Sequence, residues 1–450
     1  MDIISYKKTD VIYRDLEDII VIKNIRCNEM LTLEDVSADI WRFLVNNNSV
    51  KLSEIVSYIS EDYGINQNEI VDDIKTFICD LYYAGVVLID GKYADIELSK
   101  DSTQLYIDDG FEGEIIKIYQ EKRLIYSVTF ELTYSCNENC VHCYANYPVG
   151  SDRKELSLKI IKETLIDLYK MKCMHITFTG GDPFMFPGFA ELFEFARDLG
   201  FSCDIFTNAI YLAEHHDVLR RIIKTHPQAF YISLYGADAQ THETITTVPG
   251  SFFKTVFSIQ RIREANIPVV LNVMMLKSNA EKIEEIIAFA KFLDADYRVG
   301  ISLIFKNDGS DSPMKHFIND KNTIKKILSY EKERFFSLDQ HVGEPKAEFF
   351  CGAAETSLAI SPDGTVYPCV SLKIPLGNIL DDKISDIWDS AKRRELKTQL
   401  SWDNANQCKN CKFIEKCPHC IGISLLETGN MFSCNTCDRL LAECLYEMDF

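Results

Sequence analysis

Residues 124–144 read LIYSVTFELTYSCNENCVHCY, an apolar segment typical of a β-strand that is followed at once by three closely spaced cysteines. A [4Fe-4S] cluster normally takes four cysteine ligands, so three thiolates in one tight loop can hold three of its irons and leave the fourth open. A chelating small molecule needs such an exchangeable position, just as catalytic zinc sites keep one coordination place free. The alternatives are a zinc site that lacks one ligand and a chance grouping of Cys136, Cys140 and Cys143.

Outward from this loop, strand-like and helix-like segments alternate. Repeated strand and helix units at this spacing predict a parallel sheet, here an open barrel of six strands with helices outside. Ligands of such sheets collect at the carboxyl ends of the strands, where the motifs of this chain fall. We therefore predict an α/β fold with a partial (β/α)6 barrel over residues 123–335. Its further strands are expected at residues 174–180, 202–208, 229–236, 268–275 and 297–304.

The CxxxCxxC spacing, with the aromatic His142 before the third cysteine, resembles the signature of the radical S-adenosylmethionine (SAM) superfamily. The resemblance covers residues 124–310. In that family the open iron binds the amino and carboxylate groups of SAM. The cluster then donates an electron that cleaves the sulfonium and yields a 5'-deoxyadenosyl radical.

A glycine turn after the second strand agrees with this resemblance. Gly180, Gly181 and Asp182 resemble the family's GGEP turn, in which glycines permit close backbone approach and a carboxylate helps to bind the cofactor's amino group. Asp182 is one methylene shorter than the glutamate of the family, so its hydrogen bond to the ligand is either direct or relayed. Without the cysteines, the same residues would form an ordinary strand-to-helix turn.

Three more residues are candidate cofactor contacts by resemblance. Asn208 and Ser233 stand where the family places polar contacts to the methionine and ribose parts of SAM, although either could instead cap a turn. The family often has an arginine in the region where this chain has Thr246 and Thr247. Arg298, at the sixth strand, is the candidate replacement, and a solvated charge is the alternative.

The carboxy-terminal region, residues 336–450, is dominated by cysteines, turns and short segments. Such a stretch buries little apolar surface, so metal clusters would have to supply the cross-links. Paired CxxC elements make zinc a rival, but a gap of five residues is short when zinc pairs usually stand about 12 to 20 apart. The cysteines are Cys351, Cys369, Cys408, Cys411, Cys417, Cys420, Cys434, Cys437 and Cys444.

This arrangement resembles the SPASM extension of peptide-modifying radical SAM enzymes, in which a CX9-15GX4C stretch and a CX2CX5CX3C stretch precede one more cysteine. In this chain the last interval of the second stretch, between Cys417 and Cys420, is one residue shorter than in that pattern. The resemblance implies two auxiliary [4Fe-4S] clusters, and so three clusters in total. It leaves the inner cluster either with an open iron, for which a substrate thiolate is a natural ligand, or closed by Cys434. The implied ligands are Cys351, Cys369 and Cys420 for the inner cluster, and Cys408, Cys411, Cys417 and either Cys437 or Cys434 for the outer one.

Residues 1–95 have the outline of a small winged-helix α+β domain, with a hairpin over residues 18–34 and helices at 35–47, 51–62 and 66–84. They resemble the recognition element of pathways for ribosomally synthesised and post-translationally modified peptides (RiPPs). That family binds a leader peptide as an added strand on its sheet edge. Residues 96–122 lack a clear pattern and are predicted to be a linker.

Composition and charge limit the partners. The net charge of -20 argues against nucleic acids and anionic membranes, because both need a basic face. Residues 1–110 hold 22 acidic and 10 basic side chains, which indicates either a solvated surface or a basic peptide partner. The sequence shows no apolar run of about 20 residues and no export signal, so a cytoplasmic protein is predicted. In a reducing compartment, 16 cysteines favour metal binding over disulfides.

We therefore expect a radical SAM oxidoreductase that installs thioether crosslinks between cysteine sulfur and a residue carbon of a precursor peptide, most similar to sactipeptide and ranthipeptide enzymes. Flavodoxin or ferredoxin would supply electrons. The first alternative is a related maturase that forms a carbon-carbon crosslink or epimerises a residue. Oxidation of a sulfatase residue is disfavoured by Val370, where those relatives have aspartate. The last alternative is a non-enzymatic zinc or cluster scaffold that binds peptide or DNA. No catalytic acid or base is identified.

Overall fold

The computed structural model describes residues 3–94, 111–145, 154–330 and 351–448. The predicted boundaries at 95/96 and 335/336 lie outside these ranges. Within the described part of the chain, no helix combines the length and the apolar composition needed to cross a membrane.

The amino-terminal domain has the predicted hairpin and three helices. One antiparallel sheet has the order β2-β3-β4, and a second has the order β5-β1-β6. The helices pack on these sheets around the fully buried Trp41. The elements are β1 (Ile4–Ser5), β2 (Val11–Asp15), β3 (Ile19–Asn24), β4 (Met30–Glu34), α1 (Asp35–Asn47), β5 (Ser49–Val50), α2 (Leu52–Tyr63), α3 (Gln67–Tyr83) and β6 (Leu88–Ile89).

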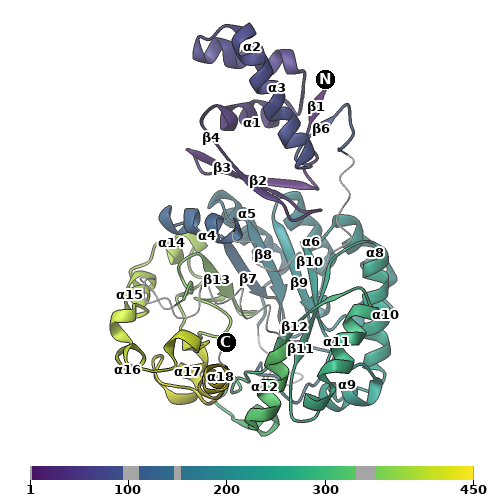
Figure 1. Ribbon diagram of the computed structural model, residues 1–450, viewed down its shortest axis with the longest axis vertical. Helices are drawn as coiled ribbons and strands as arrows, with labels where there is room; N and C mark the ends of the chain where they lie inside the picture. Colours follow the sequence, from purple (N-terminus) through teal and green to yellow (C-terminus); the bar gives the residue numbers. More distant parts are fainter. Residues whose placement is uncertain (1–2, 95–110, 146–153, 331–350, 449–450) are drawn as a thin grey trace.

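The central part confirms the predicted open barrel. Six parallel strands follow the order β12-β11-β10-β9-β8-β7, so each strand lies beside the next one in the chain. Helices connect them on the outside (Figure 1). The strands are β7 (Ser127–Glu131), β8 (His175–Thr179), β9 (Ser202–Thr207), β10 (Ala229–Ser233), β11 (Val269–Met274) and β12 (Asp296–Gly300). The helices are α5 (Leu158–Lys170), α6 (Phe189–Asp198), α7 (Ile210–Glu214), α8 (His216–Thr225), α9 (Ala239–Thr246), α10 (Ser251–Glu264), α11 (Ile283–Phe292) and α12 (Lys321–Tyr330).

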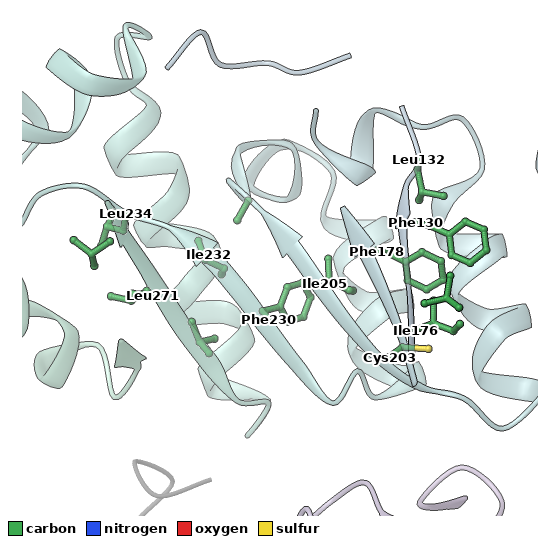
Figure 2. Packing of buried hydrophobic residues seen from close by; sticks show 14 of the residues in the cluster. Phe130, Leu132, Ile176, Phe178, Cys203, Ile205, Phe230, Ile232, Leu234 and Leu271 are labelled. Atoms are coloured by element: carbon green, nitrogen blue, oxygen red, sulfur yellow. The ribbon is translucent and has the colours of Figure 1, made fainter. Parts of the chain in front are cut away.

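The two faces of the barrel sheet differ in polarity because side chains alternate along each strand. Phe130 pairs with Phe178 in the sheet register, and Figure 2 shows both rings projecting to the same side, toward the helices. Their neighbours Thr129 and Thr177 are also paired, and they belong to the opposite face. The apolar face is thus buried under the helices, while the inner face carries polar residues.

The sheet continues into the carboxy-terminal region. Strand β13 (Ser357–Ile360) pairs in parallel with β7, and β14 (Thr365–Tyr367) and β15 (Gly377–Asn378) follow in antiparallel order. The cysteine-rich region is therefore hydrogen-bonded to the barrel. Its helices are α14 (Ile384–Trp388), α15 (Ala391–Gln399), α16 (Asn406–Lys409), α17 (Ile421–Thr428) and α18 (Thr436–Glu447).

Part of the predicted linker is a helix, which corrects the expectation for residues 96–122. Helix α4 (Phe111–Glu121) buries Ile115 and Tyr119 completely. These side chains join an apolar cluster that includes Ile12 and Val21 of the amino-terminal domain and Met174 of the barrel. Most apolar partners of this helix lie far along the chain, at residues 12–25 and at Met174, which a local sequence pattern does not reveal.

The amino-terminal domain packs at the amino ends of the barrel strands (Figure 1). Arg14 Nε donates to the Cys173 carbonyl oxygen at 2.7 Å, just before β8. The Arg14 guanidinium also lies over the rings of Tyr169 and Phe201, at 4.8 and 5.1 Å from their centroids. The two domains therefore share both an apolar cluster and a buried cation.

Candidate functional site

The three predicted cluster ligands lie together at the carboxyl end of β7. A turn closes the loop, since the Cys143 N–H donates to the Cys140 carbonyl at 3.0 Å. Cys136 and Cys143 are exposed, and Cys140 is half-buried. Burial and the neighbouring Glu138 raise the pKa of the Cys140 thiol, so a bound cation is needed to favour its thiolate. Cys136 and Cys143 are among the smaller causes that raise the pKa of Cys140, so the three thiols lie near one another, as the ligands of one cluster must.

The glycine turn after β8 packs against this loop. Gly180 has φ +144°, and a Cβ on it would lie 2.7 Å from the Thr133 carbonyl oxygen. A Cβ on Gly181 would lie only 2.1 Å from the Ser135 carbonyl oxygen. The Gly181 N–H donates to Thr133 and the Asp182 N–H donates to Ser135, at 2.8 and 2.9 Å. The glycines are thus required for the close approach of the two loops.

Asp182 is fully buried, and its carboxylate is bonded within the protein. Oδ2 accepts from Thr207 Oγ1 at 2.6 Å and from the Asn208 N–H at 3.0 Å, while Oδ1 accepts from the Phe184 N–H at 3.0 Å. Burial raises its pKa, and these hydrogen bonds oppose the rise. Asp182 therefore ties the β8 turn to the end of β9, and its predicted contact with the cofactor stays a prediction.

Asn208 reaches the cysteine loop from the end of β9. Its Nδ2 lies 3.7 Å from Cys136 Sγ and donates to Asn137 Oδ1 at 2.6 Å. Its Oδ1 accepts from the Ile210 N–H at 3.0 Å, so the side chain also caps a turn. The structure thus brings this predicted site residue to the first cysteine.

Thr246 and Thr247, at the carboxyl end of α9, hold the cysteine loop by hydrogen bonds. The Asn139 N–H donates to the Thr246 carbonyl at 3.2 Å, and Thr247 Oγ1 donates to the Asn139 carbonyl at 2.9 Å. The next turn of the loop is bound to the same helix, since the Val141 N–H donates to the Ile245 carbonyl at 3.0 Å. The carboxyl end of α9 is therefore the support of this loop.

A buried pair beneath the loop was missed by the sequence analysis. Cys140 Sγ donates to Glu138 Oε2 at 3.2 Å, and Glu138 Oε1 lies 3.9 Å from Nε2 of the buried His242. The Tyr235 N–H donates to His242 Nδ1, so the ring proton sits on Nε2 and faces Glu138. Burial raises the pKa of Glu138 to about 8 and lowers that of His242 to about 4. In the sequence, the only sign of this pair was the carboxylate residue Glu138 between Cys136 and Cys140.

The remaining predicted contacts are more scattered. The ring of the half-buried His142 lies 5.0 Å from that of Tyr235, and its Nδ1 lacks a hydrogen-bond partner within the described ranges. Ser233 ends β10 and is hydrogen-bonded to the Tyr235 side chain. Arg298 is exposed on β12, with its guanidinium 5.3 Å from the Tyr231 ring centroid. The structure gives Arg298 no contact with the cysteine loop among the residues it describes.

The carboxy-terminal thiols form two groups. In the first, Gly422 allows the start of α17 to approach the segment after Cys369, since a Cβ on Gly422 would lie 2.6 Å from the Ser371 carbonyl. Burial raises the pKa of Cys420 to about 11, and the charge of Cys369 is among the smaller causes of the increase. Burial also raises the pKa of Cys351, again with a smaller increase from Cys369. In the second group, burial raises the pKa of Cys417 to about 12, and further increases come from Asp438, Cys434, Cys408 and Cys411.

The two late cysteines differ in their surroundings. Cys434 is exposed and acts on the pKa values of both Cys408 and Cys417. Cys437 is buried, and its Sγ donates to the Leu303 carbonyl of the barrel at 3.5 Å. Burial raises the pKa of Cys437 to about 12, and no thiol is among the groups that shift it.

Within the described ranges, no three cysteine, histidine or carboxylate side chains converge closely enough to chelate a single metal ion. The donor sets near the strand ends consist of thiols, the ligand type of iron-sulfur clusters.

Comparison with known families matches all three parts of the chain. Residues 130–290 match the radical SAM superfamily, and residues 351–412 match an iron-sulfur cluster-binding domain called SPASM. Residues 19–87 match coenzyme PQQ synthesis protein D.

Several relatives share most of the chain. The AdoMet-dependent heme synthase of Methanosarcina barkeri is 25% identical over 332 residues, which cover 67% of this chain and 93% of the relative. The sporulation killing factor maturation protein SkfB of Bacillus subtilis is 27% identical over 319 residues, which cover 64% of this chain and 69% of the relative. The structure of Streptococcus suis SuiB bound to precursor peptide SuiA superposes with a TM-score of 0.64, covering 97% of this chain and 99% of that one. At 14% identity, this likeness shows the fold.

The open barrel with its cysteine loop is a radical SAM domain. The chain joins this domain to a SPASM domain and to an amino-terminal PqqD-like domain, the RiPP recognition element. These domains imply SAM, one [4Fe-4S] cluster in the barrel and auxiliary clusters in the SPASM domain.

Proposed function

We propose that the protein installs thioether crosslinks between a cysteine sulfur and a residue carbon of a ribosomally made precursor peptide. The observation that carries this proposal is the joining, in one chain, of a peptide-recognition domain to a barrel with a cysteine loop and two further thiol groups. The similarity to the maturation protein SkfB supports a peptide substrate.

The leader of the precursor binds at the free edge of β4. This strand pairs only with β3 among the described residues, and β2 forms the other edge of the sheet. One face of this sheet lies toward the barrel, since Ile12 of β2 and Val21 of β3 share an apolar cluster with Met174. A peptide added to β4 would gain backbone hydrogen bonds along the edge of the sheet.

In the barrel, Cys136, Cys140 and Cys143 would hold the radical cluster, and Asn208 and His142 would be polar contacts for SAM. When bound, the reduced cluster and SAM supply a 5'-deoxyadenosyl radical, and the auxiliary clusters supply an acceptor for the electron released when carbon joins sulfur. The peptide loses a hydrogen atom from carbon and a proton from sulfur. The residues of the loop position these groups so that the radical meets one bond.

The auxiliary ligands follow the two thiol groups. Cys351, Cys369 and Cys420 would hold the inner cluster, and a substrate thiolate could supply its fourth ligand. Cys434 is the late ligand of the outer cluster, because it lies beside its partners whereas Cys437 points to the barrel. The outer set is therefore Cys408, Cys411, Cys417 and Cys434.

The function is tested with the full chain reconstituted anaerobically with iron and sulfide. Dithionite and SAM should yield 5'-deoxyadenosine, and a cysteine-containing peptide encoded beside this gene should lose two hydrogens per crosslink while its thiols become resistant to alkylation. Flavodoxin or ferredoxin should replace dithionite. The same mass loss with thiols that still react would instead indicate a carbon-carbon crosslink. A peptide whose mass stays unchanged in ordinary water, but which takes up deuterium in deuterated solvent, would indicate epimerisation.

A variant with Cys136, Cys140 and Cys143 replaced by alanine is the matched control. It should make no 5'-deoxyadenosine. Zinc binding without any adenosine product in the native chain would refute the enzymatic proposal altogether.

A further inference from the structure

Asp438 is a buried carboxylate at the junction of the SPASM domain and the barrel. It lies in the first turn of α18 and is 2% exposed. Asn435 caps this helix, and its Oδ1 accepts from the Asp438 N–H at 2.8 Å. The carboxylate is therefore held in one orientation by its own helix start.

Three segments of the chain meet at this carboxylate. Oδ2 accepts from the Cys420 N–H at 2.8 Å and from Asn435 Nδ2 at 2.6 Å. Oδ1 lies 3.4 Å from Oγ of Ser302, in the barrel segment after β12. The Asn435 amide also donates to Ser424 Oγ of α17 at 3.0 Å, which ties α17 to the same network.

The carboxylate lies close to both auxiliary thiol groups. It holds the backbone of Cys420, which belongs to the inner group, and it raises the pKa of Cys417, which belongs to the outer group. Cys417 and Cys420 are separated by only two residues. Asp438 thus contacts the segment from Cys417 to Cys420, which connects the outer thiol group to the inner one.

We propose that Asp438 is a positioning residue that fixes the Cys417–Cys420 segment and so holds the two auxiliary thiol groups in register with the barrel. An ionised carboxylate oxygen accepts the two converging N–H groups, and such charge-assisted bonds are stronger than neutral ones. Alanine at this position would leave the half-buried Cys420 N–H without its acceptor. The proposal concerns cluster assembly and does not depend on the identity of the peptide substrate.

The test uses the full chain in a background in which Cys136, Cys140 and Cys143 are alanine, so that only auxiliary clusters bind. After anaerobic reconstitution this background should hold about 8 irons per chain. Asp438→Ala should lose about 4 of them, because Cys420 is displaced. The matched control is Glu447→Ala, which removes a carboxylate of the same helix that contacts Lys321 and Lys325 of α12 instead. It should keep the full iron content.

A second variant covers the case in which Asp438→Ala does not fold. Asp438→Asn keeps an oxygen acceptor but removes the negative charge, so its iron should remain while the reduction potential of an auxiliary cluster rises in an EPR-monitored titration. A purely structural helix start would leave that potential unchanged. The proposal is overturned if Asp438→Ala keeps its iron and its EPR signals, if Glu447→Ala loses as much iron as Asp438→Ala, or if the potential of Asp438→Asn equals that of the background.

Discussion

Gly181 lies so close to Ser135 that a Cβ on it would stand 2.1 Å from the Ser135 carbonyl oxygen. The turn after β8 and the loop that carries the first three cysteines are therefore built as one unit, because neither can move without the other. The contact connects the two sequence motifs that were first recognised separately.

Replacing Gly181 with alanine should separate these loops. Overpacking of this kind typically destabilises by about 1 to 3 kcal/mol, and a clash with backbone is at the upper end. We expect a lower melting temperature of the cluster-free protein and loss of the barrel cluster. Gly352→Ala is the control, since a Cβ there meets nothing within 4 Å. Equal melting temperatures of the two variants would contradict the close approach.

His242 should make the cluster-free protein less stable on acidification. Burial lowers its pKa from 6.5 to about 4, so between these pH values the unfolded chain binds a proton that the folded chain does not. This contribution is fully present above pH 6.5 and lost as the pH falls toward 4, by up to about 3 kcal/mol. Glu138, whose pKa burial raises from 4.5 to about 8, acts in the opposite sense over part of this range, so the effect of His242 is measured as a difference between two proteins. In His242→Asn, the side-chain oxygen can still accept the Tyr235 N–H. Urea unfolding at several pH values should show the stability difference between the native chain and this variant growing from pH 4 to pH 6.5, and a difference that does not change with pH would exclude His242 as the cause.

The late cysteines should respond differently to substitution. Cys434→Ala should reduce the iron content from about 12 to about 8 per chain, because the outer cluster loses its fourth ligand. Cys437→Ala should keep its iron and show only a modest loss of stability, as its thiol contacts the Leu303 carbonyl. Iron analysis after anaerobic reconstitution measures both. The reverse pattern would assign the ligand to Cys437.

Arg14→Ala should loosen the amino-terminal domain from the barrel. The substitution removes a buried hydrogen bond to the Cys173 carbonyl and a cation between two rings, which together are worth about 2 to 4 kcal/mol. Thermal unfolding should begin earlier, and proteolysis should release the domain faster. Lys51→Ala, at an exposed position of the same domain, should behave like the native chain. Unchanged unfolding of Arg14→Ala would show that the other contacts, the apolar cluster and hydrogen bonds such as that from Gln228 to Asn28, hold the interface without Arg14.

The barrel was predictable because its strands carry strong local patterns. Phe130 and Phe178 alternate with polar neighbours on their own strands, and this alternation survives in the structure. The helices of the amino-terminal domain were likewise predicted to within a residue or two. Helix α4 was missed because most residues that bury Tyr119 lie far away in the chain.

The candidate site was only partly predictable. The spacing of Cys136, Cys140 and Cys143 identified the loop, since a tight loop fixes its own ligands. Asp182 was recognised as a site residue, but its bonds to Thr207 and the Asn208 amide depend on the packing of β8 against β9. The choice between Cys434 and Cys437 depends on how α18 meets the barrel, which no local pattern reveals.

The fixed attachment of the amino-terminal domain sets a minimum length for the substrate. The domain sits at the amino ends of strands whose carboxyl ends carry the cysteine loop, and β7 and β8 each span five residues, a height of about 17 Å. A precursor held on β4, as we propose, would have to cross at least that height before any of its atoms met the radical. Residues directly after the bound segment would then be out of reach, and modification would begin only beyond a spacer of several residues.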